Sequence, residues 1–121
     1  MTTWETVLSV QPFALALLAR AVLAQGRKAE AVLNAQDAYS QLERLGVVDD
    51  GEATIRLALA ECLVAAGDTQ AARGILDKAS GRILSSAEAI EDPAIRESFL
   101  TRIPEHRRIL ELAREITAPS N

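Results

Sequence analysis

The stretch LLARAVLAQGRKAEAVLNAQDAY, residues 17–39, reads as an apolar helix, a glycine and a second apolar helix. The stretch LALAECLVAAGDTQAARGILDKA, residues 57–79, repeats this order. When Gly26 is placed on Gly67, the segments around the two glycines align without a gap. The spacing predicts a helical hairpin that occurs twice, and hairpins of this kind stack on one another to cover their apolar sides. The matched pairs are Leu18 with Leu59, Ala19 with Ala60, Val22 with Leu63, Ala31 with Ala72 and Ala38 with Ala79.

The composition limits both the core and the partners. The chain has 121 residues, enough for one domain with a modest core. It is 49% hydrophobic but only 3% aromatic, so alanine and leucine have to build that core. The net charge of −4 argues against binding to nucleic acid, which needs a basic face.

Cellular context is predicted from one cysteine and from hydropathy. Cys62 is the single cysteine, so it cannot form an internal disulfide, and its apolar surroundings in sequence predict a buried thiol. No apolar stretch reaches the roughly 18 residues that cross a bilayer. The start of the chain lacks the basic region of a signal peptide. We therefore expect a cytoplasmic protein without a membrane partner.

Helix signals cover most of the chain, and alternating strand patterns are nearly absent. Pro12 fits a first helical turn, and Gly26 and Gly67 fit helix ends. Asp49 or Asp50, Asp68 or Thr69, and the pair Asp92–Pro93 fit helix starts, and Pro104 forces a further break. The predicted units are an N-terminal segment at 1–11, in which Thr2 and Glu5 fit the capping box of a short helix, a first hairpin at 12–46, a second hairpin at 51–90 and two capping helices at 93–116.

The repeated pattern resembles the tetratricopeptide repeat. In that family a large and a small residue stand side by side on the first helix, a glycine-containing turn follows, and small residues recur on the second helix. Leu18-Ala19 with Gly26 fits these positions in the first unit, and Leu59-Ala60 with Gly67 fits them in the second. The resemblance implies an all-α fold, a right-handed superhelix of two hairpins with a C-terminal capping pair.

Two departures from the family pattern stand out. The family's usual Trp and Tyr are replaced by Leu15 and Val22 in the first unit and by Arg56 and Leu63 in the second. The period, which runs from Gly26 to Gly67, exceeds the family's usual length of about 34 residues and implies longer second helices. The last third, DPAIRESFLTRIPEHRRILELARE, resembles the closing segment of long bacterial tetratricopeptide regulators. Its apolar residues are expected to cap the second hairpin: Phe99, Leu100, Ile109, Leu110 and Leu112.

The resemblance also implies a function, protein–protein interaction without catalysis. Members of the family bind ligands in a groove lined by the first helices. Transferred to this sequence, the groove would suit an apolar or amphipathic peptide or helix, because it is largely apolar with one Arg and one Glu. It lacks the Lys and Asn with which some members hold acidic C-terminal tails. The expected groove residues are Phe13, Ala16, Arg20, Leu23, Ala24, Thr54, Leu57, Glu61, Val64 and Ala65.

The residues give no sign of an enzyme. His106 is the single histidine, and its place in EHRR predicts a solvated surface. Glu88, Glu91 and Asp92 are explained by the preference of carboxylates for helix ends. No catalytic, cofactor-binding or metal-binding residue is therefore assigned. The alternative function is structural: a helical bundle that forms a homodimer, which would cover the open N-terminal end of the first hairpin.

Overall fold

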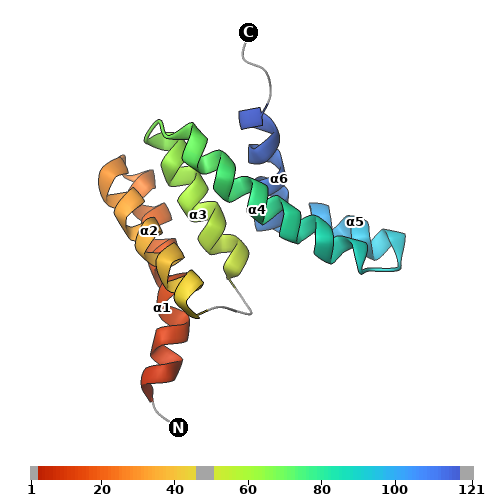
Figure 1. The fold of residues 1–121 in the computed structure, drawn as a ribbon, viewed down its shortest axis with the longest axis horizontal. Coiled ribbons are helices and arrows are strands. Elements are labelled where there is room, and N and C mark those ends of the chain that lie inside the picture. The colour runs from red at the N-terminus through yellow and green to blue at the C-terminus, as the bar shows by residue number, and fades with distance from the viewer. Residues whose placement is uncertain (1–2, 46–50, 118–121) are drawn as a thin grey trace.

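The structure, a computed structural model, describes residues 3–45 and 51–117, with side chains placed from 12 to 44 and from 51 to 116. This part of the chain is all-α and contains no strand, which confirms the predicted class. The helices in chain order are α1 (Thr3–Ala24), α2 (Lys28–Leu45), α3 (Glu52–Ala65), α4 (Thr69–Glu88), α5 (Pro93–Thr101) and α6 (Pro104–Thr117) (Figure 1).

The two predicted glycine turns have the same geometry. Gly26 and Gly67 both adopt the left-handed conformation, with φ of 84° and 89°. After α1, Arg27 N–H donates to the Val22 carbonyl at 3.2 Å, and after α3, Asp68 N–H donates to the Leu63 carbonyl at 2.9 Å. Both bonds belong to a Schellman motif, which satisfies carbonyls that the helix end leaves free. The chain therefore reverses in the same way at equivalent positions of both repeats.

Helix starts were predicted correctly where a side chain makes the cap. Asp68 accepts a hydrogen bond from Ala71 N–H at 3.2 Å at the start of α4. Asp92 accepts one from Ala94 N–H at 2.8 Å at the start of α5, directly before Pro93. Both caps are local contacts within one helical turn, so sequence alone identifies them.

One other helix start differs from the prediction, and the predicted cap of another lies outside the described residues. Pro12 does not open a helix, because α1 begins at Thr3 and contains Pro12 in its interior. Proline has no N–H to donate to the carbonyl four residues earlier, so α1 continues with one backbone bond fewer. The cap of α3 is Gly51, at φ 97°, with no side-chain bond, and the predicted caps Asp49 and Asp50 lie outside the described residues. A side chain at Gly51 would collide with the ring of Phe13.

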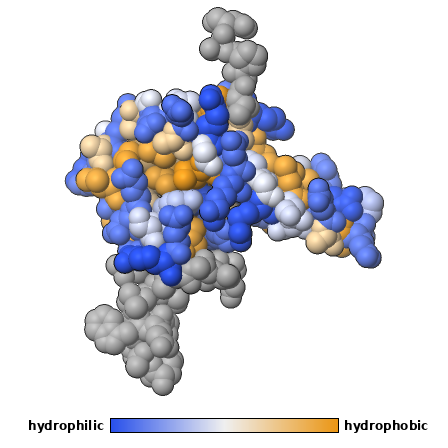
Figure 2. Space-filling view, in the orientation of Figure 1, coloured by the Kyte–Doolittle hydropathy of each residue, from blue (hydrophilic) through white to orange (hydrophobic). Residues whose placement is uncertain are grey.

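Helix α3 occupies the centre of the fold. It packs against α1 and α2 on one side and against α4 and α6 on the other. Residues 54–60 are all buried, together with Cys62 and Leu63. Figure 1 shows α3 between α2 and α4, and Figure 2 shows that the apolar core reaches the surface between these two helices. Val32 of α2 and Ile75 of α4 pack partly buried against this core.

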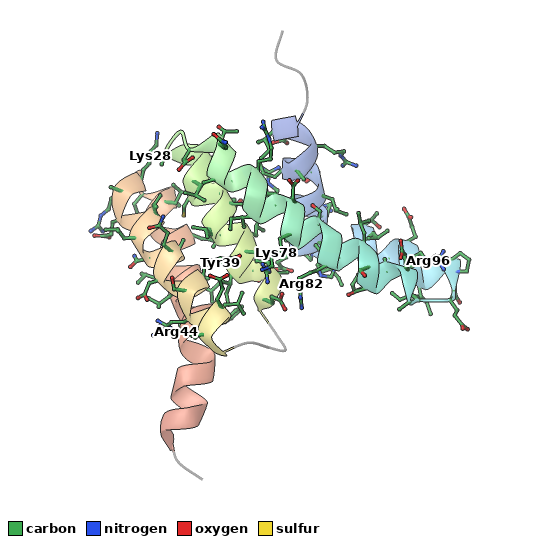
Figure 3. The ribbon with its side chains drawn as sticks, viewed as in Figure 1. Lys28, Tyr39, Arg44, Lys78, Arg82 and Arg96 are labelled. Carbon is green, nitrogen blue, oxygen red and sulfur yellow. The ribbon has the colours of Figure 1, made fainter. Side chains whose placement is uncertain are left out.

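The capping helices use different contacts. Ile109 and Leu112 of α6 are buried against α3 and α4, and the other predicted capping residues pack partly buried beside them. Helix α5 has no buried residue. Its Arg96, labelled in Figure 3, donates to the carbonyls of Ala87 and Ile90 at 2.6–3.2 Å. The guanidinium thus ties α5 to the end of α4 through backbone oxygens.

One matched pair behaves differently in the two repeats. Leu59 is 4% exposed, as expected of a core residue, whereas Leu18 is 49% exposed. The match in sequence therefore does not extend to burial at this pair. Leu59 packs against the preceding hairpin, and no such hairpin precedes Leu18 in the described residues.

We expect Ala60→Leu to destabilise the fold by about 1–3 kcal/mol, because Ala60 is fully buried against α4 and α6 and three more heavy atoms have no space there. Urea unfolding measures the change. Ala71→Leu, on the exposed side of α4, is the control and should change stability by less than about 0.5 kcal/mol. Equal stability of the two variants would contradict the packing described for α3.

Candidate functional site

A cleft of about 390 Å³ lies between the first turns of α3, the second half of α4, and α5 with α6. Its apolar wall includes buried Ala79, Ile83 and Ile109, with Phe99 and Ile103 partly buried beside them. Charged and polar groups share the lining, which suits a ligand with one apolar part and one polar part. These polar residues are Glu52, Thr54, Arg56, Arg82, Ser86, Glu105 and His106.

Glu52 is the centre of the charge network at this cleft. Its Oε1 accepts from Arg56 at 2.9 and 3.1 Å and lies 2.6 Å from Arg82 Nε. Arg56 in turn donates to the Tyr39 hydroxyl at 3.4 Å, with its guanidinium 5.6 Å from the ring centroid. Tyr39 and Arg82 approach α3 from α2 and α4 in Figure 3. The network therefore joins both hairpins: Arg56 reaches Tyr39 of the first, and Glu52 links Arg56 to Arg82 within the second.

Arg56 is a charged side chain inside the fold, at a position where the resemblance led us to expect an aromatic residue. Its side chain is 7% exposed. A buried cation is stable only when a counter-charge and hydrogen bonds replace its water. Glu52 supplies the charge, and Tyr39 supplies a hydroxyl and a ring face. Sequence reasoning missed this network because its members come from three helices.

His106 is not the solvated residue that the sequence predicts. It is half-buried, its Nδ1 lies 2.9 Å from the Phe99 carbonyl, and its ring lies 4.5 Å from the Phe99 ring. A carbonyl only accepts, so Nδ1 carries the proton in this bond. In the neutral ring Nε2 is then an acceptor. His106 thus forms part of the cleft lining while its Nδ1 is held by the Phe99 carbonyl.

A second charge network crosses α1, α3 and α6. Arg20 Nε lies 3.1 Å from Glu61 Oε1, and Arg108 Nε lies 4.0 Å from Glu61 Oε2. Arg108 also pairs with Glu115 at 3.3 Å. Arg20 and Glu61 hold equivalent positions in the two repeats, because each stands the same distance before its turn glycine. The sequence predicted both for the groove, and the structure pairs them with each other.

The ten predicted groove residues do not form one open surface. Three of them, Ala16, Thr54 and Leu57, are buried, so they do not line an open groove. Leu23 and Val64 pack partly buried on the core. The remaining five are Phe13, Arg20, Glu61 and Ala65, which are partly exposed, and Ala24, which is exposed. The exposed part of the predicted groove is therefore more charged than the sequence suggests. Of the ten residues, only Thr54 also lines the cleft.

Cys62 lies close to the second network but inside the core. Its side chain is fully buried among Ala19, Leu59 and Leu63. Burial, with a smaller contribution from the Glu61 carboxylate, raises the pKa of the thiol from 9.0 to about 11, and Arg20 opposes the shift. A thiol in this environment remains protonated near neutral pH and is a poor nucleophile.

We expect Glu52→Gln to destabilise the protein by about 1–3 kcal/mol, because it leaves the buried Arg56 without its counter-charge. Urea unfolding measures the loss. The matched control is Glu30→Gln, which breaks the exposed Arg27–Glu30 pair and should cost less than about 0.5 kcal/mol. A loss no larger than that of the control would show that Glu52 does not neutralise Arg56.

We expect thiol reagents to label Cys62 slowly in the native protein and rapidly in urea. A shift from 9.0 to about 11 lowers the thiolate fraction at neutral pH about 100-fold, and burial blocks access as well. The raised pKa in the folded state also predicts stability that is present below pH 9 and lost as pH rises toward 11. Cys62→Ala should reduce this loss, and rapid labelling of the native protein would contradict the burial of Cys62.

Within the described residues, no helix is long and apolar enough to cross a membrane. The same residues contain no group of three or more His, Cys, Asp or Glu side chains that could hold a metal ion. Comparisons of the chain with protein-family models, with curated proteins and with solved structures found no match.

Proposed function

We propose that the protein is a non-catalytic interaction module built from tetratricopeptide-like hairpins, and that it binds an apolar or amphipathic peptide or helix. The observation that carries the proposal is the cleft, which combines a buried apolar wall with charged residues. One apolar side chain of a peptide would enter beside Ile83 and Phe99. Polar groups of the same peptide would meet Glu52, Arg82 and His106.

The helix arrangement supports a stacked-repeat architecture. Each hairpin turns through the same Schellman motif, and α3 packs on both helices of the first hairpin. Helix α6 packs against α4 and α3, as α3 packs against α2 and α1. It therefore takes the place that the first helix of a third unit would have. Under this proposal the hairpins form a right-handed superhelix, and α1, α3 and α6 line its inner side.

Charge favours an amphipathic ligand over an acidic tail. Arg20 and Arg108 lie on the proposed inner side, and both are paired with Glu61. Arg56 and Arg82 at the cleft are paired with Glu52. An acidic peptide would have to break these pairs, whereas an apolar anchor with mixed charges would not. The proposal includes a cytoplasmic location and a regulatory role, which the composition and the resemblance of residues 92–115 imply.

Selection from a phage-displayed library of random peptides tests the proposal. We expect the wild-type protein to enrich peptides with an apolar anchor and nearby charges. Ser86 is exposed on α4 and lines the cleft, so Ser86→Trp would block the opening without entering the core. It should weaken binding of the selected peptides at least about tenfold, as measured by calorimetry.

The matched control is Ser85→Trp, which adds the same side chain at the next exposed position of α4, away from the cleft lining. It should bind the selected peptides as the wild type does. Thermal unfolding of both variants checks that the fold is kept. The proposal is wrong if no peptide is enriched, or if Ser86→Trp binds as tightly as Ser85→Trp.

A further inference from the structure

Helix α1 carries an exposed row of apolar side chains that covers nothing in the described structure. We call Ala14, Leu17, Leu18, Ala21 and Ala24 the outer face of α1; all five are exposed. The two leucines are 45% and 49% exposed. Such a row on a helix normally packs against another helix, because burial of apolar side chains lowers the free energy.

The second repeat shows what normally covers this row. The positions of the second repeat that match Ala14, Leu17, Leu18 and Ala21 belong to α3. There they are at most 4% exposed, because the first hairpin packs on them. The same surface is therefore buried by a neighbouring hairpin in unit two and uncovered in unit one. The equivalent residues are Ile55, Ala58, Leu59 and Cys62.

The outer face has the spacing and charge of a helix-pairing surface. Ala14, Leu17, Ala21 and Ala24 follow one another at intervals of three and four positions, which places them along one side of α1. The row extends over about three turns of a helix that is 22 residues long. None of these residues is charged. A partner helix must therefore be apolar and neutral along its contact.

The outer face itself meets these requirements. In an antiparallel pair with the two-fold axis between Leu17 and Leu18, Ala14 lies opposite Ala21 of the second copy. Leu17 then lies opposite Leu18 of the second copy. The alanines let the two helix backbones approach closely, and the leucines fill the space at the two-fold axis. The outer face can therefore form the contact on both copies. We propose that a second copy of this chain occupies the outer face of α1 and forms an antiparallel, two-fold symmetric dimer.

The other end of the molecule favours a closed dimer over a filament. Helix α6 buries Ile109 and Leu112 toward α4, and it exposes Arg107 and Glu115. A third copy would find no equivalent apolar row there. Pairing through α1 therefore ends after two chains, as expected of an isologous interface.

Sedimentation equilibrium of the full chain between about 1 and 100 µM tests the dimer. We expect twice the 13.0 kDa chain mass, and Leu18→Glu should raise the dissociation constant at least about 100-fold by placing like charges at the two-fold axis. Leu33→Glu is the matched control: Leu33 is 67% exposed on α2, outside the outer face, and its change should leave the dimer intact.

A wild-type monomer over the whole range, or a dimer that Leu18→Glu leaves unchanged, would overturn the proposal. Mixed oxidation tests the orientation. A chain with Ala14→Cys and a chain with Ala21→Cys should form a disulfide with each other more readily than either forms with itself, whereas a parallel pair would favour like with like. Peptide binding at the cleft is measured separately, so either proposal can fail without the other.

Discussion

The close approach of helices at buried alanines is the constraint on which the structure depends. Fully buried alanines occur on α1, α2, α3 and α4, and two of them in the first hairpin, Ala19 and Ala31, match Ala60 and Ala72 of the second. A methyl group at a crossing lets two backbones come close, and the leucine or isoleucine beside it fills the remaining space. The low aromatic content follows from this packing. The alanines are Ala16, Ala19, Ala31, Ala35, Ala38, Ala58, Ala60 and Ala72.

Polar groups also connect the helices around this core of small residues. One network joins α2, α3 and α4 through Tyr39, Arg56, Glu52 and Arg82. A second joins α3 to α1 and α6 through Glu61. Charge-assisted hydrogen bonds form only at defined distances. These groups therefore fix the positions of the helices more narrowly than contacts between methyl groups do. They also place charged side chains beside the apolar wall of the cleft, so the cleft combines polar and apolar surface.

The sequence predicted features that depend on neighbouring residues. The turns at Gly26 and Gly67 and the cap at Asp92 need only a few adjacent positions, and all three were predicted correctly. Features that depend on distant residues were missed. Gly51 is required because Phe13 lies against it, His106 is half-buried because Phe99 covers it, and Leu18 is exposed because no hairpin precedes it in the described residues. The cleft combines residues of four helices, so no local pattern could indicate it.

The way α5 is attached has a consequence for local opening of the fold. No residue of α5 is fully buried: Arg96 bonds to two carbonyls, and Phe99 and Leu100 pack partly buried on the core, whereas α3 is enclosed by four helices. Local opening costs less where fewer buried contacts are lost, so we expect the backbone amides of α5 to exchange hydrogen with solvent faster than those of α3. Phe99 lines the cleft from α5, so this exchange rate also reports how firmly one wall of the cleft is held.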